Sequence, residues 1–143
     1  MKVLVTGGTG FVGPHVVRAL AASGHDLKLL VRDATRSREL PGQPVVGEMT
    51  NAVSLTTAIE GVDAVVHLVA IRQGREEEFK RVMEQGTRDL VEAAKQAGVT
   101  RFVLMSALGT SEQTMDLVPY YRAKWAMERA VAESGLELSL IHI

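Results

Sequence analysis

The stretch KVLVTGGTGFVG, residues 2–13, runs from a strand-like apolar segment straight into Gly7, Gly10 and Gly13, and a helix-like segment near 11–23 follows. Glycines at this spacing form a tight turn, let the backbone approach a phosphate, and let the helix pack closely on the strand. The helix N-terminus adds free N–H groups and a positive dipole end. This order predicts a phosphate-binding turn opening an α/β domain. The alternative is a glycine-rich turn that binds nothing.

Four later glycines organise the rest of the chain. Gly24, Gly61, Gly98 and Gly135 each end a helix-like segment and stand shortly before a β-rich apolar run. They lie 37 residues apart, but the sequences between them differ, so they indicate a recurring topology and not a repeat. The pattern predicts strands near 2–6, 27–31, 44–46, 62–69, 101–105 and 136–141, and helices near 11–23, 52–60, 79–97 and 119–134.

Continuous apolar strands that alternate with amphipathic helices predict one parallel sheet with helices on both faces. The fold class is therefore α/β, a Rossmann-type doubly wound sheet of about six strands formed by a single domain, residues 1–143. The acidic run at 76–78 is expected to be the first turn of its helix, where the helix dipole favours carboxylates. Glu77 and Arg81 are four residues apart and are expected to form an exposed ion pair on this helix.

Composition excludes several classes of protein. With 46% hydrophobic and 23% charged residues, the chain is neither disordered nor collagen-like nor a coiled coil. A net charge of −1 provides no field for nucleic acid or an anionic membrane. The absence of cysteine argues against disulfides, thiolate chemistry and a metal site. The apolar stretch at 62–71 is too short to span a bilayer, and no signal peptide is recognisable, so we expect a cytoplasmic protein.

The end of the second predicted strand bears on cofactor choice. A dinucleotide site places an acidic residue there for the adenosine ribose, or an arginine where a 2′-phosphate must be held. Here Arg32 comes first and Asp33 second, and residues 28–38 carry four basic side chains against one acidic. This excess favours NADP, with NAD as the alternative. Arg36 and Arg38 are also open to a simpler reading as part of a solvated loop.

A second set of residues suggests chemistry. Tyr120 and Lys124 are four residues apart and lie on one helix face, where the ammonium is expected to favour the phenolate and make the tyrosine an acid or base. Ser106 directly follows the fifth strand, at the sheet edge where ligands of such folds bind. The alternative is a packed tyrosine beside a solvated lysine. Tyr121 has Trp125 at the same spacing, and we expect Trp125 to pack.

The motifs TGGTGFVG, VRD, VVHLVA, RFVLMSALG and YYRAK occur in the order typical of the short-chain dehydrogenase/reductase superfamily, which the chain resembles over nearly its whole length. The resemblance is to the extended and atypical branches, to epimerase-like proteins related to the NADPH-binding accessory subunit of respiratory complex I and to NmrA-like regulators. It implies either an NADP-dependent oxidoreductase, epimerase or dehydratase acting on a small carbonyl or nucleotide-sugar-like substrate, or a protein that binds NADPH without turnover.

The resemblance also implies roles for single residues. Tyr120 would transfer a proton, Lys124 would tune it and hold the nicotinamide ribose, and Ser106 would orient the substrate. His67, inside the fourth strand, is expected to be a packed histidine rather than a catalytic one. Besides Tyr120 and Lys124, the implied cofactor contacts are Gly7, Thr9, Gly10, Phe11, Val12 and Gly13 in the turn, Arg32 at the adenosine, Glu48 and Met49 at the adenine, and Val69 and Ala70 at the nicotinamide ribose.

The end of the chain departs from the family pattern. Relatives continue from the last strand into Arg-Pro and a Tyr-Gly turn, whereas residues 136–141 are followed here by His-Ile. We therefore expect either an N-terminal fragment whose substrate domain is missing or truncated, or a chain whose last residues have diverged. Its last strand would then be an unprotected sheet edge. The expected partners are a dinucleotide cofactor and an unidentified small substrate, with homo-oligomers and membrane-complex association left open.

Overall fold

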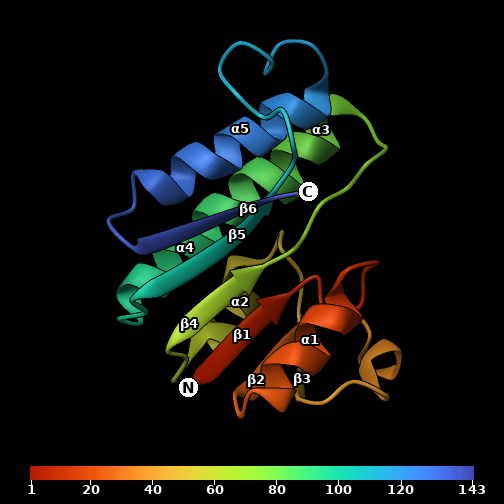
Figure 1. Ribbon diagram of the computed structural model, residues 1–143, viewed down its shortest axis with the longest axis vertical. Coiled ribbons are helices and arrows are strands. Elements are labelled where there is room, and N and C mark those ends of the chain that lie inside the picture. Colours follow the sequence, from red (N-terminus) through yellow and green to blue (C-terminus); the bar gives the residue numbers. More distant parts are fainter.

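The computed structural model describes all residues from 1 to 143, and it contains one parallel sheet with the strand order β3-β2-β1-β4-β5-β6 (Figure 1). The chain builds outward from β1 to β3, crosses back to β4 and continues outward to β6, which confirms the doubly wound prediction. The strands are β1 (Lys2–Thr6), β2 (Asp26–Val31), β3 (Gln43–Val46), β4 (Ala64–His67), β5 (Arg101–Ser106) and β6 (Glu137–His142).

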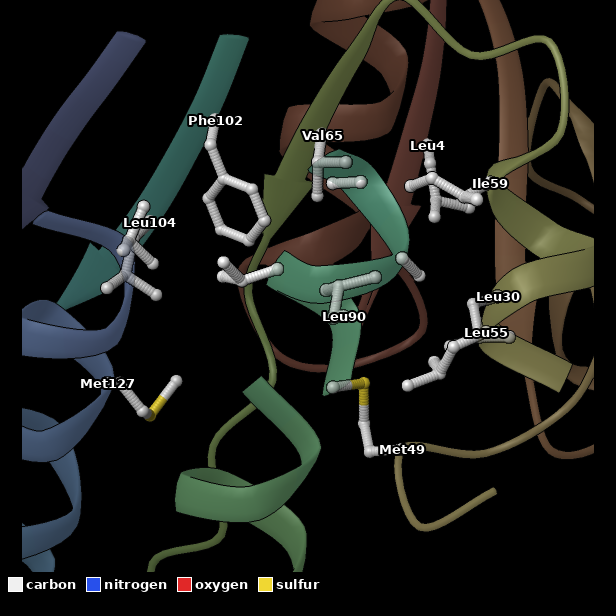
Figure 2. Packing of buried hydrophobic residues seen from close by; sticks show 14 of the residues in the cluster. Leu4, Leu30, Met49, Leu55, Ile59, Val65, Leu90, Phe102, Leu104 and Met127 are labelled. Carbon is white, nitrogen blue, oxygen red and sulfur yellow. The ribbon is translucent and has the colours of Figure 1, made fainter. Parts of the chain in front are cut away.

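Helices cover both faces of the sheet, as predicted. They are α1 (Gly13–Ala22), the 3₁₀ turn η1 (Ala34–Ser37), α2 (Ala52–Ile59), α3 (Glu76–Glu78), the π-helical η2 (Phe79–Gln85), α4 (Gly86–Gln96) and α5 (Pro119–Ala132). The larger core cluster, of 20 buried residues, lies between the sheet and α2, α4 and α5. In Figure 2, Leu4, Val65 and Phe102 of the sheet lie opposite Leu90 and Met127 of these helices. A smaller cluster of eight packs against α1.

The four evenly spaced glycines have the backbone conformation that was predicted. Gly24, Gly61, Gly98 and Gly135 have φ values of +80°, +66°, +74° and +81°, and no atom beyond the adjacent residues lies within 4 Å of where a Cβ would stand. The left-handed backbone, and not lack of space, therefore requires glycine at these helix ends.

The fourth strand is shorter than predicted. Residues 62–69 were expected to be extended, but β4 includes only Ala64–His67. Val62 belongs to the turn after α2, where its N–H donates to the Ile59 carbonyl. Beyond the strand, the backbone N–H of Leu68 still donates to the Thr6 carbonyl at 3.0 Å, but the chain then leaves the sheet. The apolar run was continuous because its end lines a cavity, described below.

The helix predicted at 79–97 changes its winding along its length. Three α-helical residues, Glu76–Glu78, are followed by seven π-helical residues and then by α4, so the acidic first turn is confirmed. The predicted ion pair between Glu77 and Arg81 is absent, and Glu76 pairs instead with Lys80 at 2.8 Å. Arg81, in the same π-helical segment, instead lines the cavity described below.

The last strand forms one edge of the sheet. β6 pairs only with β5, and five of its six residues are exposed. None of the helices has both the length and the apolar character needed to cross a membrane.

Candidate functional site

A cavity of about 430 Å³ opens at the carboxyl ends of β1 to β4, next to the point where the strand order reverses. This volume is in the range of small-molecule sites, and open α/β sheets bind ligands at this position. The cavity brings together eight of the predicted cofactor residues: Gly7, Thr9, Gly10, Arg32, Glu48, Met49, Val69 and Ala70.

The glycine turn has no room for side chains at its two ends. A Cβ on Gly7, where φ is +77°, would lie 2.9 Å from the backbone of Leu68 and Val69. One on Gly13 would lie 2.3 Å from the Gly8 carbonyl oxygen. The turn is therefore held against both α1 and the chain after β4, and Gly7 and Gly10 present backbone without a side chain to the cavity. This geometry fits a dinucleotide pyrophosphate, for which a close backbone approach is needed.

Three of the predicted cofactor residues in the turn do not line the cavity. Phe11 is 96% exposed, Val12 is half-buried, and Gly13 is buried where α1 begins. Pro14 follows in the first helical turn, where its missing N–H leaves no hydrogen bond unmade. The cavity side of the turn is thus formed by Gly7, Thr9 and Gly10.

The end of β2 presents basic side chains to the cavity. Arg32 and Arg36 line it, and neither has a carboxylate within ion-pair distance. Asp33 does not face the cavity with a free carboxylate. The carboxylate accepts hydrogen bonds from the Thr35 N–H at 2.9 Å and from the Thr35 hydroxyl at 2.7 Å. These bonds hold the pKa of Asp33 below its ordinary value. Arg38 does not line the cavity.

Sequence reasoning missed one wall of the cavity. This wall consists of residues that follow β4 and residues at the α3–η2 junction, namely Ile71, Gln73, Glu78, Arg81 and Val82. Nothing in the helical periodicity indicated them, because that periodicity assigned Arg81 to an exposed ion pair. The shortened β4 and the π turn together create this wall.

The predicted catalytic residues gather outside this cavity, at the carboxyl end of β5. Lys124 is 2% exposed, and its ammonium donates to the Met105 carbonyl at 2.8 Å. Burial lowers the pKa of Lys124 to about 8. Its Nζ lies 5.9 Å from the centre of the Tyr120 ring, so these two share a helix face as predicted. Ser106 is also 2% exposed, and its hydroxyl donates to the Thr110 hydroxyl at 3.4 Å.

The expected effect of the lysine on the tyrosine is not found. Burial, and then Tyr121, raise the pKa of Tyr120 above its ordinary value, while Arg72 acts in the opposite direction. The prediction that Lys124 favours the phenolate of Tyr120 is therefore wrong for this structure. The Lys124 ammonium instead lies over the tyrosine ring and donates to a backbone carbonyl. The neighbouring Tyr121 donates its hydroxyl proton to the Leu108 carbonyl at 3.4 Å.

Trp125 is half-buried and belongs to neither core cluster. It lines an outer groove between α4 and α5 beside Val91 and Arg129. The expected packing is thus partial and lies on the surface of the helix pair.

His67 is fully buried and has hydrogen-bond partners on both ring nitrogens. Nδ1 lies 2.5 Å from the Thr6 hydroxyl, and Nε2 lies 2.9 Å from the Thr87 hydroxyl. Burial, and then the charge of Lys124, lower the pKa of His67 to about 3, so its ring is neutral. The prediction of a packed histidine is confirmed.

Comparison with known proteins agrees with this geometry. The family model for NAD(P)H-binding proteins matches residues 7–143. The chain is 36% identical over 131 residues to a 3-beta-hydroxysteroid dehydrogenase of Mycolicibacterium neoaurum, covering 82% of this chain and 35% of that protein. It is 30% identical to the photosystem II assembly factor Ycf39 of Synechocystis, covering all of this chain and 44% of that protein.

Among solved structures, a short-chain dehydrogenase/reductase superfamily protein from Agrobacterium tumefaciens with bound NAD superposes with a TM-score of 0.84 and 30% identity. The match covers 99% of this chain and 48% of that one. The chain thus spans less than half the length of each of these three proteins. By its family match and its fold, the chain belongs to the NAD(P)H-binding proteins of the short-chain dehydrogenase/reductase superfamily.

Proposed function

We propose that this chain is the cofactor domain of an NADP-dependent oxidoreductase that reduces a small carbonyl substrate, with Ser106, Tyr120 and Lys124 as its catalytic residues. The observation that carries the cofactor preference is the different placement of the basic and acidic side chains that follow β2. Arg32 and Arg36 line the cavity, while the carboxylate of Asp33 is hydrogen-bonded to Thr35 outside it. A carboxylate acceptor suits a ribose diol, whereas guanidinium donors suit a 2′-phosphate.

We assign Tyr120 the role of proton donor. A phenol ordinarily titrates at about pH 10 and burial raises the pKa of Tyr120 further, so it carries its proton at neutral pH and can serve as an acid. Its proton would pass to the carbonyl oxygen of the substrate, while the Ser106 hydroxyl orients that oxygen. A bound reduced nicotinamide supplies the hydride for the carbonyl carbon. Lys124, whose ammonium donates to the Met105 carbonyl, would hold the nicotinamide ribose.

The test is a comparison of two phenol-to-phenyl substitutions. In Tyr120→Phe, turnover over a panel of carbonyl substrates should fall at least about a hundredfold, because the proton donor is lost, and NADPH affinity should stay within about twofold. Tyr121→Phe removes the adjacent hydroxyl, which bonds only a loop carbonyl, and should retain turnover. Retained turnover in Tyr120→Phe would refute the assignment.

A second candidate function is NADPH binding without turnover, as in a structural or regulatory protein. The burial of Ser106 and Lys124, both 2% exposed, favours it, because neither polar group is open to a substrate. The similarity to an assembly factor supports it as well. Cofactor oxidation measured across carbonyl substrates, beside a binding titration without substrate, separates the two functions. Binding without any turnover would favour this second one.

A further inference from the structure

Arg81 occupies a place that its sequence spacing does not suggest. Four residues after Glu77, it should lie on an exposed α-helical face, but it belongs to the π-helical segment η2 and lines the cavity with its neighbour Val82. Single π turns occur often at functional sites, because they redirect a few side chains without ending the helix.

The guanidinium of Arg81 has no protein partner. The preceding residue, Lys80, pairs with Glu76 at 2.8 Å, and Arg122 donates to the same carboxylate at 3.2 Å. Glu78 also lines the cavity, but its Oε2 accepts the backbone N–H of Arg75 at 2.8 Å. Arg81 is thus an exposed cation on the cavity wall that makes no ion pair and no hydrogen bond within the protein.

The helix that follows Arg81 packs on the segment after β3, which lines the same cavity. Gly86, at the start of α4, lies against Met49, since a Cβ on this glycine would come 2.9 Å from the Met49 carbonyl oxygen. The helix is therefore anchored on the segment after β3, where the adenosine end of a dinucleotide is expected. Arg32 and Arg36 line the same cavity from the end of β2.

We propose that Arg81 is a third specificity residue for NADP, and that it binds the 2′-phosphate of the cofactor from the helix side, opposite Arg32 and Arg36. This inference rests on the proposed preference for NADP. Arginine suits the role because its planar fork donates two parallel hydrogen bonds to a phosphate. A cavity with three unpaired guanidiniums gains more from a 2′-phosphate dianion than from a ribose hydroxyl.

The experiment is a titration of wild-type protein and Arg81→Gln with four ligands: NADPH, NADH, 2′,5′-ADP and 5′-AMP. The variant should bind NADPH and 2′,5′-ADP about tenfold more weakly, the usual loss for one charge-assisted contact. Its affinity for NADH and 5′-AMP should change by less than about twofold. Arg88→Gln, on the same helix but outside the cavity, is the matched control and should bind like the wild type.

Each failure has its own meaning. Unchanged NADPH affinity in Arg81→Gln, with a wild type that prefers NADPH, overturns this inference and leaves the proposed cofactor preference intact. Equal losses for NADPH and NADH would also overturn it, because Arg81 would then act on the pyrophosphate. A wild type that binds NADPH and NADH equally overturns the preference itself. Arg81 is exposed, so its replacement does not disturb the core, and an unchanged melting temperature verifies this.

Discussion

The cavity beside the glycine turn and the residue cluster at the end of β5 hold their cations in opposite ways. Arg32, Arg36 and Arg81 are exposed, line the cavity and have no carboxylate partner. Lys124 is buried, and its ammonium donates to the carbonyl of Met105. The first region offers unpaired charge to an anionic ligand from outside. The second region holds a buried charge, and this burial lowers folding stability. Buried charges of this kind are often found at reactive sites.

The largest loss of cofactor binding in the first region is expected when a methyl group is placed in the glycine turn. Gly13→Ala puts a Cβ 2.3 Å from the Gly8 carbonyl oxygen, so the backbone of the turn must move. NADPH affinity should fall more than about a hundredfold, equivalent to roughly 3 kcal/mol. Gly24→Ala, at the other end of α1, is the control: there is open space at this position, and only backbone strain of about 1 kcal/mol is added. It should bind NADPH normally, and a titration checks both variants.

The buried lysine of the second region should be visible in the pH dependence of stability. The pKa of Lys124 is about 8 in the folded protein and 10.5 in the unfolded chain, so between these values the unfolded chain binds more protons. The free energy of unfolding should therefore rise by about 3 kcal/mol between pH 8 and pH 10.5 through this group. Lys124→Met should lack this rise, and exposed Lys95→Met should keep it. Denaturation at several pH values measures the rise. An equal change in the free energy of unfolding with pH in all three proteins would contradict the lowered pKa of Lys124.

The buried histidine that adjoins both regions provides a smaller effect at acid pH. Because the pKa of His67 is about 3 when folded and 6.5 when unfolded, only the unfolded chain takes up a proton below pH 6.5. Stability should fall by about 2 kcal/mol on lowering the pH to 5 through this group. His67→Gln should lose this dependence, whereas His15→Gln, at an exposed position, should retain it. Urea denaturation at several pH values measures the difference.

The fold was predictable because its signals are local. The β1–turn–α1 unit is encoded by apolar residues and glycines within residues 2–13, and each later helix end carries a glycine with positive φ. The cavity residues on this unit were predictable for the same reason, since the carboxyl ends of parallel strands meet at one edge of the sheet.

The remaining features depend on tertiary packing. The π turn that carries Arg81 ends where Gly86 packs on Met49, and no helical period reports that contact. The raised pKa of Tyr120 follows from its burial, which the spacing to Lys124 does not specify. From the sequence, Lys124 was expected to be either a catalytic or a solvated charge. Neither expectation included a buried ammonium that donates to the carbonyl of a strand residue.

The central claim is that the cavity at the carboxyl ends of β1 to β4 is built for NADP. Titration of the wild-type protein with NADPH and with NADH tests it most directly, with Arg32→Ala as the paired variant. NADPH should bind at least about fivefold more tightly than NADH, and Arg32→Ala should narrow this gap because one guanidinium contact is lost. Equal affinities of the wild type for the two cofactors would contradict it.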